Sequence, residues 1–420
     1  MADAGFDKVG VFVAGGPAAG INGVIKGIVQ EATNAGARVV GFLDGARGLY
    51  FGNVMELTRT RVEHIEFLGG SILGTSRFDP RRSPDGFDRI LATLRQEGVD
   101  GVISIGGEGT LQLAEVLRQR GVRIVHVPKT IDNDIYGVSQ TFGFDTAVHE
   151  AARLLTTISL DAHTSATWFM VEIMGRYTGH LALEAGLASG ATRVLIPEEG
   201  PIDVESLADL VAARQRIGID WGVVVVAESA HFGEGYITRF GRLGGVAERL
   251  AERLDDTCRR RSLEVSIRFS NLGYFLRCAE PTGFDKSYAA QLGTAAARFL
   301  FDPDRSGQMV TIEHDHLVGV PIAAVAGKMK PVDLNGVRYR ALKAIERYEA
   351  AAGEVAPEEI GVERMREVLH WLESNCSPQM IGQVATRLGM SAPGLLRAME
   401  EVVEVATGEA ARRGHTGPSP

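Results

Sequence analysis

Short apolar runs alternate with amphipathic stretches along most of the chain. In the first third, runs with the length of buried strands cover residues 9–14, 37–43, 100–105 and 122–127, and helical spacing covers 21–34 and 111–119. A second set of expected strands covers 168–173, 193–196, 221–227 and the strand-like segment 269–276. Strands that alternate with helices predict parallel, doubly wound sheets. We therefore expect an α/β fold with two lobes.

The last part of the chain follows a different pattern. Residues 357–411 have helical spacing throughout, and residues 412–420 form an expected frayed tail. Ala385, Gly389 and Leu395 are placed as in a helix-turn-helix. Helical hairpins in general share this placement, and Arg397 is the one basic residue of 391–401. A packing or dimerisation module is therefore preferred to a DNA reader.

Composition narrows the class of protein. The chain has 420 residues, more than one compact core usually holds, and its 51 glycines make about 12% of it against a typical value of about 7%. The net charge of −9 disfavours nucleic acid and membrane surfaces. Cys258, Cys278 and Cys376 have no metal-ligand spacing, and neither a signal peptide nor a membrane-spanning run is visible. We expect a cytoplasmic protein with many tight turns or phosphate loops.

Two glycine-rich loops each lie between an expected strand and an expected helix. The first begins with Gly15 and Gly16, and glycines there let backbone amides approach an anion such as phosphate. A tight strand-to-helix turn explains this loop equally well on its own. The second, 106–110, carries Glu108, which could hold a magnesium ion against phosphate oxygens. Its alternative is a carboxylate favoured by the helix dipole.

Two carboxylates follow the apolar run that ends at residue 127. Asp132 is the candidate general base, because the nearby charge of Asp134 can tune it to accept a hydroxyl proton. Asp134 could instead orient metal-bound water or an arginine. Taken alone, the segment 130–134 would more often be a turn with solvated aspartates.

Arginines supply the positive charge that phosphoryl transfer requires. Arg77, Arg176, Arg268 and Arg277 all lie beside glycine-containing motifs or the expected strand 269–276. A guanidinium matches phosphate oxygens and keeps its charge, although any single arginine can be a plain surface residue.

These motifs resemble, in order, the signatures of the phosphofructokinase superfamily over about residues 8–335. They lie at 15–22, 106–110 (Gly-Gly-Glu-Gly-Thr), 128–134 (Pro-Lys-Thr-Ile-Asp-Asn-Asp), 141–145, 174–176 and 272–277, with further matches at 278–285 and 326–330. The resemblance implies a two-lobed, oligomeric α/β kinase, a dimer or tetramer, that uses Mg²⁺ to phosphorylate a sugar hydroxyl. We expect a catalytic core at 1–345, with a donor lobe at about 1–145, an acceptor lobe at about 146–260 and the remainder shared. A helical C-terminal extension at 346–420 follows.

The resemblance also assigns roles to individual residues. The implied catalytic residues are Asp132, Asp134, Thr130 and Arg176, with Glu108 as the metal-associated acid. The implied donor-binding residues are Gly15, Gly16, Arg77, Gly106, Gly107, Glu108, Gly109, Thr110 and Lys129. The implied acceptor-binding residues are Thr130, Asp132, Asp134, Thr167, Met174, Gly175, Arg176, Glu228, Arg268, Tyr274 and Arg277.

The choice of donor depends on two positions. Pyrophosphate users of the family carry an aspartate where this chain has Gly109 and a lysine where it has Lys129, whereas ATP users typically have glycine at both. An aspartate would obstruct and repel a nucleotide's α-phosphate, and glycine leaves that space empty. ATP is therefore the preferred donor and pyrophosphate the alternative.

The acceptor side departs from the family pattern. Thr167 stands where fructose 6-phosphate users commonly present an arginine across a subunit interface, Tyr274 replaces a frequent histidine, and Ala19 and 278–280 also differ. The segment Arg259-Arg260-Arg261 could supply compensating charge. The preferred function is conversion of fructose 6-phosphate to fructose 1,6-bisphosphate.

Two other functions remain open. One is a repurposed kinase for an unphosphorylated sugar, cyclitol or nucleoside in a specialised biosynthetic pathway. The other, a non-catalytic sensor of nucleotide or sugar phosphate, is disfavoured because Glu108, Asp132, Asp134 and Arg176 are all present.

Overall fold

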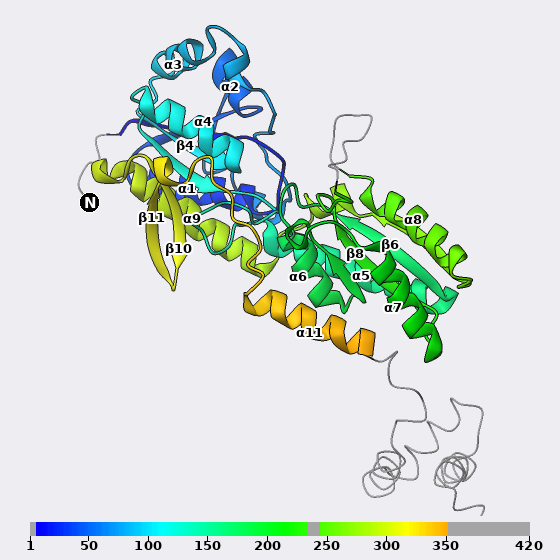
Figure 1. Cartoon of the computed structure of the whole chain (residues 1–420). Coiled ribbons are helices and arrows are strands. Elements are labelled where there is room, and N and C mark those ends of the chain that lie inside the picture. The colour runs from blue at the N-terminus through cyan, green and yellow to red at the C-terminus, as the bar shows by residue number, and fades with distance from the viewer. Residues whose placement is uncertain (1–5, 234–243, 352–420) are drawn as a thin grey trace, which may run out of the picture. The chain divides into compact units, whose positions relative to one another are not determined.

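The computed structural model describes residues 6–233 and 244–351 (Figure 1). The predicted C-terminal extension beyond residue 351, including the helix-turn-helix-like segment and the tail, lies outside the described residues. By its contacts the chain divides into one unit of Met1–Ala208 and Asp220–Glu346 and another of Asp209–Ile219 and Arg347–Pro420. In the described part of the second unit, Arg214 forms an ion pair with Glu349. Both sheets and all predicted site residues belong to the first unit.

The larger sheet of the first unit has seven strands in the order β11-β10-β5-β4-β1-β2-β3. Its strands are β1 Lys8–Val13, β2 Arg38–Phe42, β3 Val54–Glu56, β4 Gly101–Gly106, β5 Ile124–Pro128, β10 Gln308–Glu313 and β11 His316–Pro321. The central strands are parallel, as the sequence predicts, but β3 pairs with β2 and β11 pairs with β10 in antiparallel fashion.

Helices cover both faces of this sheet because side chains alternate along its buried strands. Val9, Val11 and Val13 of β1 join one hydrophobic cluster, and Phe12 and Ala14 join another. The helices around this sheet are α1 Ile21–Asn34, α2 Ala46–Phe51, α3 Gly86–Gln96, α4 Glu108–Gln119 and α9 Gly283–Phe301.

Helices α1 and α9 pack closely against each other (Figure 1). Glycines make the close approach possible, since a Cβ added to Gly27 would lie 2.7 Å from the Ala290 carbonyl oxygen and one on Gly293 would meet the Val24 carbonyl. A helix in 283–301 is not among the sequence predictions, which assign no element to that segment.

The smaller sheet has four parallel strands in the order β7-β8-β6-β9. They are β6 Thr167–Ile173, β7 Arg193–Leu195, β8 Gly222–Ala227 and β9 Ser266–Asn271, with helices α5 Phe144–Ser165, α6 His180–Ser189, α7 Val204–Arg216 and α8 Val246–Arg260. The prediction of a strand over 269–276 is wrong in its second half, where the 3₁₀ turn η4 (Gly273–Leu276) replaces it. Leu276 is buried there while Phe275 is exposed, a pattern that a turn shares with a strand.

Buried hydrogen bonds fix the start of α5, which leads from the first sheet to the second. The Asp285 carboxylate accepts from the backbone N–H groups of Gly143 (2.9 Å) and Thr146 (2.8 Å). The Thr282 hydroxyl donates to Asp145 at 2.5 Å. The N-termini of α5 and α9 are thereby joined. The helices α10 Ile322–Val325 and α11 Val337–Ala351 follow later in the chain.

Candidate active site

Most of the predicted site residues lie just beyond the carboxyl ends of parallel strands. Loops that follow β1, β4 and β5 meet at one edge of the large sheet, because β4 pairs in parallel with both β1 and β5. A Cβ added to Gly15 would lie 3.5 Å from Lys129 Nζ and 3.9 Å from Thr110 Oγ1, and one on Gly16 would lie 3.8 Å from Arg277 Cζ. The two glycine loops, the segment after β5 and Arg277 therefore form one cluster.

Lys129 ties the first glycine loop to the segment after β5. Its ammonium donates to the carbonyl oxygens of Ala14 (3.1 Å) and Gly16. The side chain is only 2% exposed, and burial lowers its pKa to about 8 while the Asp132 carboxylate opposes that shift. Gly15 has φ 87°, which favours glycine. Lys129 thus places a cation beneath the loop and fixes the loop's backbone.

The Asp132 carboxylate is surrounded by groups that shift its pKa. Burial, together with the carboxylates of Asp134 and Glu228, raises its pKa to about 7. Arg277 and the backbone N–H of Arg176 act in the opposite direction. The Asp132 N–H donates to Thr130 Oγ1 at 3.0 Å, which fixes the turn that carries the carboxylate. A base is most effective when its pKa lies near the working pH.

Two further carboxylates, Glu108 from the predicted donor side and Asp134 from the predicted acceptor side, lie close enough for the charge of Asp134 to raise the pKa of Glu108. One Glu108 oxygen accepts from the Gly327 N–H (2.5 Å) and from Gln112 Nε2 (3.1 Å), whereas the other is buried and receives no hydrogen bond from the described residues. Burial raises the pKa of Glu108, and the charge of Asp134 adds to that shift. Burial likewise raises the pKa of Asp134. Both shifts indicate carboxylates that gain from a nearby cation.

This donor set fits Mg²⁺. Magnesium is usually held by one or two carboxylates together with substrate phosphates and water. Within residues 6–233 and 244–351, no three His, Cys, Asp or Glu side chains gather as a protein-only metal site. The unpaired oxygen of Glu108, with Asp134 nearby, suits the former arrangement.

The loops after β6 and β8 carry several of the residues predicted to bind the acceptor. Glu228 Oε1 accepts from the Gly175 N–H at 3.4 Å, and the Ser229 hydroxyl donates to the Gly175 carbonyl at 2.9 Å. Burial raises the pKa of Glu228, and the charges of Arg277 and Arg176 oppose the shift. Gly175 adopts φ 154°, and a Cβ there would lie 2.7 Å from the Thr178 carbonyl oxygen. The backbone of 174–176 is therefore fixed against Glu228.

Three of the predicted arginines lie on loops of this cluster. Arg176 is exposed, and its guanidinium lies 5.2 Å from the Tyr177 ring centroid. Arg277 lies 4.9 Å from the Tyr274 ring centroid, and that ring is 61% exposed. Arg77 is exposed next to Ser76, which pairs with Ala14 in an isolated bridge. Met174 is buried at the start of the same loop as Arg176.

Thr167 and Arg268 do not join this cluster within one chain. Thr167 opens β6, and a seven-residue strand spans about 20 Å, so it lies at the opposite end of β6 from Met174. Its buried hydroxyl is bonded to the Ser165 carbonyl (3.1 Å) and Ser266 Oγ (3.4 Å). Arg268 is exposed on β9, the edge strand, in register with Phe169.

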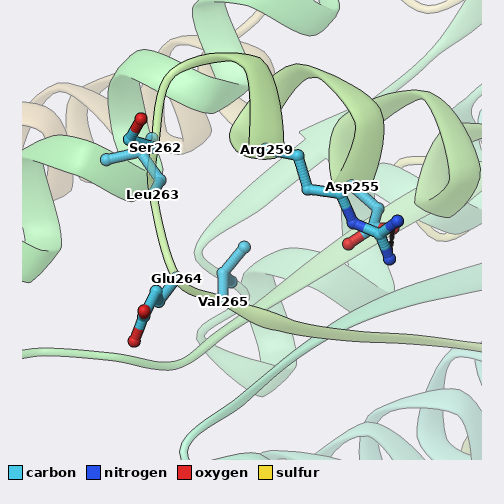
Figure 2. Close-up of a pocket in the computed structure, with 6 residues that line it drawn as sticks. All are labelled: Asp255, Arg259, Ser262, Leu263, Glu264 and Val265. Carbon is cyan, nitrogen blue, oxygen red and sulfur yellow. Dashed lines mark ion pairs between the residues drawn. The ribbon is translucent and has the colours of Figure 1, made fainter.

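The arginines at 259–261 are engaged with acidic neighbours. Arg259 pairs with Asp255 at 2.7 Å, and Arg260 and Arg261 both pair with Glu205. A surface hollow of about 480 Å³ lies where α8 leads into β9, and Arg259 and Asp255 line it. Figure 2 shows these two side chains next to each other. None of the predicted site residues lines this hollow, which is completed by Ser262, Leu263, Glu264 and Val265.

Sequence reasoning missed several polar residues that shape the site. Glu172 is buried inside β6, where it accepts from Asn271 Nδ2 (2.6 Å) and the Ala247 N–H (3.2 Å) and raises the pKa of Glu228. A lone carboxylate in an otherwise apolar strand is the signal that could have found it. Lys330 contacts the segment after Asp132, and only its place in a family-like stretch pointed to it.

Comparisons with known proteins agree with this architecture. The family model described as phosphofructokinase matches residues 8–300. The chain is 37% identical over 335 residues to an ATP-dependent 6-phosphofructokinase 2 of Streptomyces coelicolor, covering 77% of this chain and 96% of that one. The identity and the two shares are the same for a pyrophosphate–fructose 6-phosphate 1-phosphotransferase of Amycolatopsis methanolica. An ATP-dependent 6-phosphofructokinase of Corynebacterium efficiens is 34% identical over 78% of this chain and 96% of its own length.

Solved structures share the fold. A pyrophosphate-dependent phosphofructokinase from Marinobacter aquaeolei superposes with a TM-score of 0.69 at 19% identity, covering 82% of this chain and 91% of that chain. The T-state phosphofructokinase of Pichia pastoris gives a TM-score of 0.68 at 23% identity, covering 86% of this chain and 40% of its own longer chain. Among the described residues, no helix is long and apolar enough to cross a membrane.

Proposed function

Since the chain belongs to the phosphofructokinase family, we propose that it transfers the γ-phosphoryl group of ATP to fructose 6-phosphate, giving fructose 1,6-bisphosphate and ADP. The observation that carries this proposal is Asp132, whose pKa is raised to about 7 beside two glycine loops and Arg277. That arrangement suits removal of a proton from a sugar hydroxyl next to a bound polyphosphate.

The proposed reaction is a direct in-line displacement. The backbone of the loops after β1 and β4 holds the donor phosphates, and Asp132 accepts the proton of the acceptor hydroxyl as the new O–P bond forms and the bond to the leaving ADP breaks. Arg176 and Arg277 stabilise the charge that spreads over the transferring group. Glu108 and Asp134 would hold Mg²⁺, which neutralises charge on the donor phosphates when bound.

ATP is the proposed donor because the space next to Gly109 is open. Gly109 is exposed, and a Cβ added there would meet no atom within 4 Å, so the space that an aspartate would occupy is open. Lys129 directs its ammonium to the carbonyls of Ala14 and Gly16. Since one relative is named for pyrophosphate, both donors belong in the test.

The experiment measures transfer from ATP and from pyrophosphate to sugars with and without a 6-phosphate, with Mg²⁺ present and with it removed by chelation. We expect transfer from ATP to fructose 6-phosphate that depends on Mg²⁺. A higher kcat/KM for unphosphorylated acceptors would reject the proposed acceptor, and a preference for pyrophosphate would reject the proposed donor.

We also propose that the working form is a homo-oligomer, a dimer or tetramer, located in the cytoplasm. Arg268 lies on an exposed edge strand together with Phe269, whose side chain is 51% exposed, and nearby Phe275 is 74% exposed. Exposed apolar side chains on an unpaired edge favour association with another chain. Arg268 would then complete the acceptor pocket of a second copy.

Mixing two inactive variants tests this arrangement. If Arg268 acts in a neighbouring chain's site, an oligomer that combines Asp132→Asn and Arg268→Ala chains contains some sites with both native residues. Co-refolded mixtures should recover part of the wild-type activity, whereas each variant refolded alone should not. No recovery in mixtures that sedimentation shows to contain both chains would count against a shared site.

A further inference from the structure

The segment 327–332, which follows α10, makes hydrogen bonds to both sides of the proposed site. Its Gly327 N–H donates to Glu108, and the Lys330 N–H donates to the Asp134 carbonyl at 2.8 Å. Met329 pairs with Ile135 in an isolated antiparallel bridge. The segment therefore runs alongside the turn that carries Asp132.

The Lys330 ammonium is bound to that turn at three points. It donates to Asn133 Oδ1 (3.1 Å), the Val138 carbonyl (3.0 Å) and the Ser139 carbonyl (3.0 Å). An ammonium has three N–H donors, so these bonds use all of them. Because Asn133 directly follows Asp132 and residues 138–139 close the same loop, a single cation fixes both ends of the loop.

Asn133 links this contact with Lys330 to the conformation of the turn. Its backbone has φ 52°, a conformation that asparagine tolerates better than most residues. Its Oδ1 also accepts from the Thr141 N–H at 3.1 Å. The oxygen shared between Lys330 and Thr141 thus holds the left-handed residue next to the base.

The same segment is anchored on the side of the smaller sheet. The Lys330 carbonyl lies 3.0 Å from His180 Nε2, and since a carbonyl can only accept, that nitrogen carries the proton. The Val332 N–H donates to Glu198 Oε1 at 2.9 Å, and Glu198 also accepts from the Gly179 N–H. Gly179 and His180 lie at the start of α6, close after the Met174–Arg176 motif.

We propose that Lys330 is a positioning residue for phosphoryl transfer: through Asn133 it holds the Asp132 turn in the conformation that aims the base, and its segment ties that turn to α6. The inference rests on the proposed function. Lys330 touches neither donor nor acceptor in this scheme, so its loss should affect the chemical step and leave donor binding intact.

The test compares Lys330→Met with Lys328→Met, an exposed lysine of the same segment whose Nζ lies 5.5 Å from the Tyr136 ring centroid. We expect Lys330→Met to lower kcat about 10- to 100-fold, since a misplacement of about 1 Å can cost that much, with ATP affinity by calorimetry changed less than about threefold. Lys328→Met should stay within about twofold of wild type.

A second arm separates positioning from other roles. In the Asp132→Asn background, Lys330→Met should change the residual rate less than about threefold, because the base it positions is already gone. If Lys330→Met lowers that residual rate as much as it lowers the wild-type rate, or weakens ATP binding in step with kcat, the proposal is wrong.

Asn133→Gly covers the case in which Lys330→Met does not fold. Glycine accepts the positive φ and removes only the shared amide, so kcat should fall about three- to tenfold with ATP affinity retained. An unchanged kcat in Asn133→Gly would reject the proposal. Absence of wild-type transfer to fructose 6-phosphate would instead reject the proposed function, which keeps the two failures distinct.

Discussion

The two ends of β6 differ in how completely one chain builds them. At the carboxyl end, Gly175, Glu228 and Asp132 are fixed by hydrogen bonds within the chain, and their neighbourhood contains the shifted carboxylates. At the amino end, Thr167 is satisfied by Ser165 and Ser266, and Arg268 is exposed on the adjacent edge strand. One chain therefore fixes the carboxylates of the proposed site by its own contacts, whereas at the far end of the strand it leaves Arg268 exposed.

The largest expected effect is at the carboxyl end of β6. Asp132→Asn should lower kcat by about 10²- to 10⁴-fold, because the hydroxyl proton loses its acceptor while the loops that hold ATP remain. Steady-state rates measure the loss of kcat, and calorimetry measures whether ATP still binds. Asp88→Asn, which removes only an exposed partner of Arg120, should be nearly neutral. If the kcat of Asp132→Asn were close to that of the wild type, Asp132 would not be the base, and the contrast between the two ends of β6 would lose its basis.

The donor loop gives the next effect. Gly109→Asp should raise the KM for ATP about 10- to 100-fold and change the KM for pyrophosphate much less, because the added carboxylate repels the nucleotide's α-phosphate. The matched control is Gly283→Asp, where an added Cβ also meets nothing within 4 Å. Equal effects on both donors would show that the space above Gly109 does not select the nucleotide.

The pH dependence of the activity should come only from the carboxyl end of β6, where Asp132 lies. With the pKa of Asp132 raised to about 7, kcat/KM should fall about tenfold per pH unit below that value, because the protonated base cannot accept a proton. The same pKa shift also makes the stability of the folded protein depend on pH. A folded-state pKa above the unfolded value of 3.8 means that the native state loses stability as pH rises towards 7.

Asp132→Asn should therefore raise Tm by about 2–5 °C at pH 8 and have little effect at pH 4. Thermal unfolding at both pH values measures this. A Tm gain that is equal at pH 4 and pH 8 would mean that burial of the charged Asp132 is not its cause.

The smallest effect is expected at the amino end of β6. Thr167→Val keeps the shape of the side chain and removes the hydroxyl bonded to Ser165 and Ser266, so the free energy of unfolding should fall by about 1 kcal/mol. The KM for fructose 6-phosphate should change less than about twofold. Denaturant unfolding and steady-state assays measure the pair. A large rise in KM would place Thr167 in the acceptor pocket and contradict the contrast.

The sequence predicts the strands near the site well because each is a short, mostly apolar run. Six of the eight described strands that it predicts lead directly into predicted site loops, and the other two, β2 and β7, pair with strands that do. It misses β3, which has only three residues, and it misses the hairpin of β10 and β11, in which β10 also pairs with the distant β5. It extends β9 into η4 because apolar residues continue through both. The predicted lobe boundaries near 145 and 260 stay a prediction.

The sequence singles out the clustered residues that lie in its motifs, and it misses the contacts that come from far along the chain. Glu108, Asp132 and Asp134 stand out as carboxylates after apolar runs. The bond from Gly327 to Glu108 joins residues 219 positions apart, and that from Lys330 to Asn133 joins residues 197 apart. No local pattern specifies such pairs. The individual roles assigned to the site residues stay predictions until the variants are measured.

The packing of α1 against α9 sets an order in which this chain can acquire its structure. α1 ends at Asn34 and α9 begins at Gly283, so roughly 250 residues must be synthesised before the glycine-lined contact can form. At about 5–20 residues per second, the first helix waits about 12–50 s on the ribosome without its neighbour. The apolar side of α1 is a surface that chaperones can bind during that interval, and the first glycine loop gains its final support only when nearly the whole catalytic core has emerged.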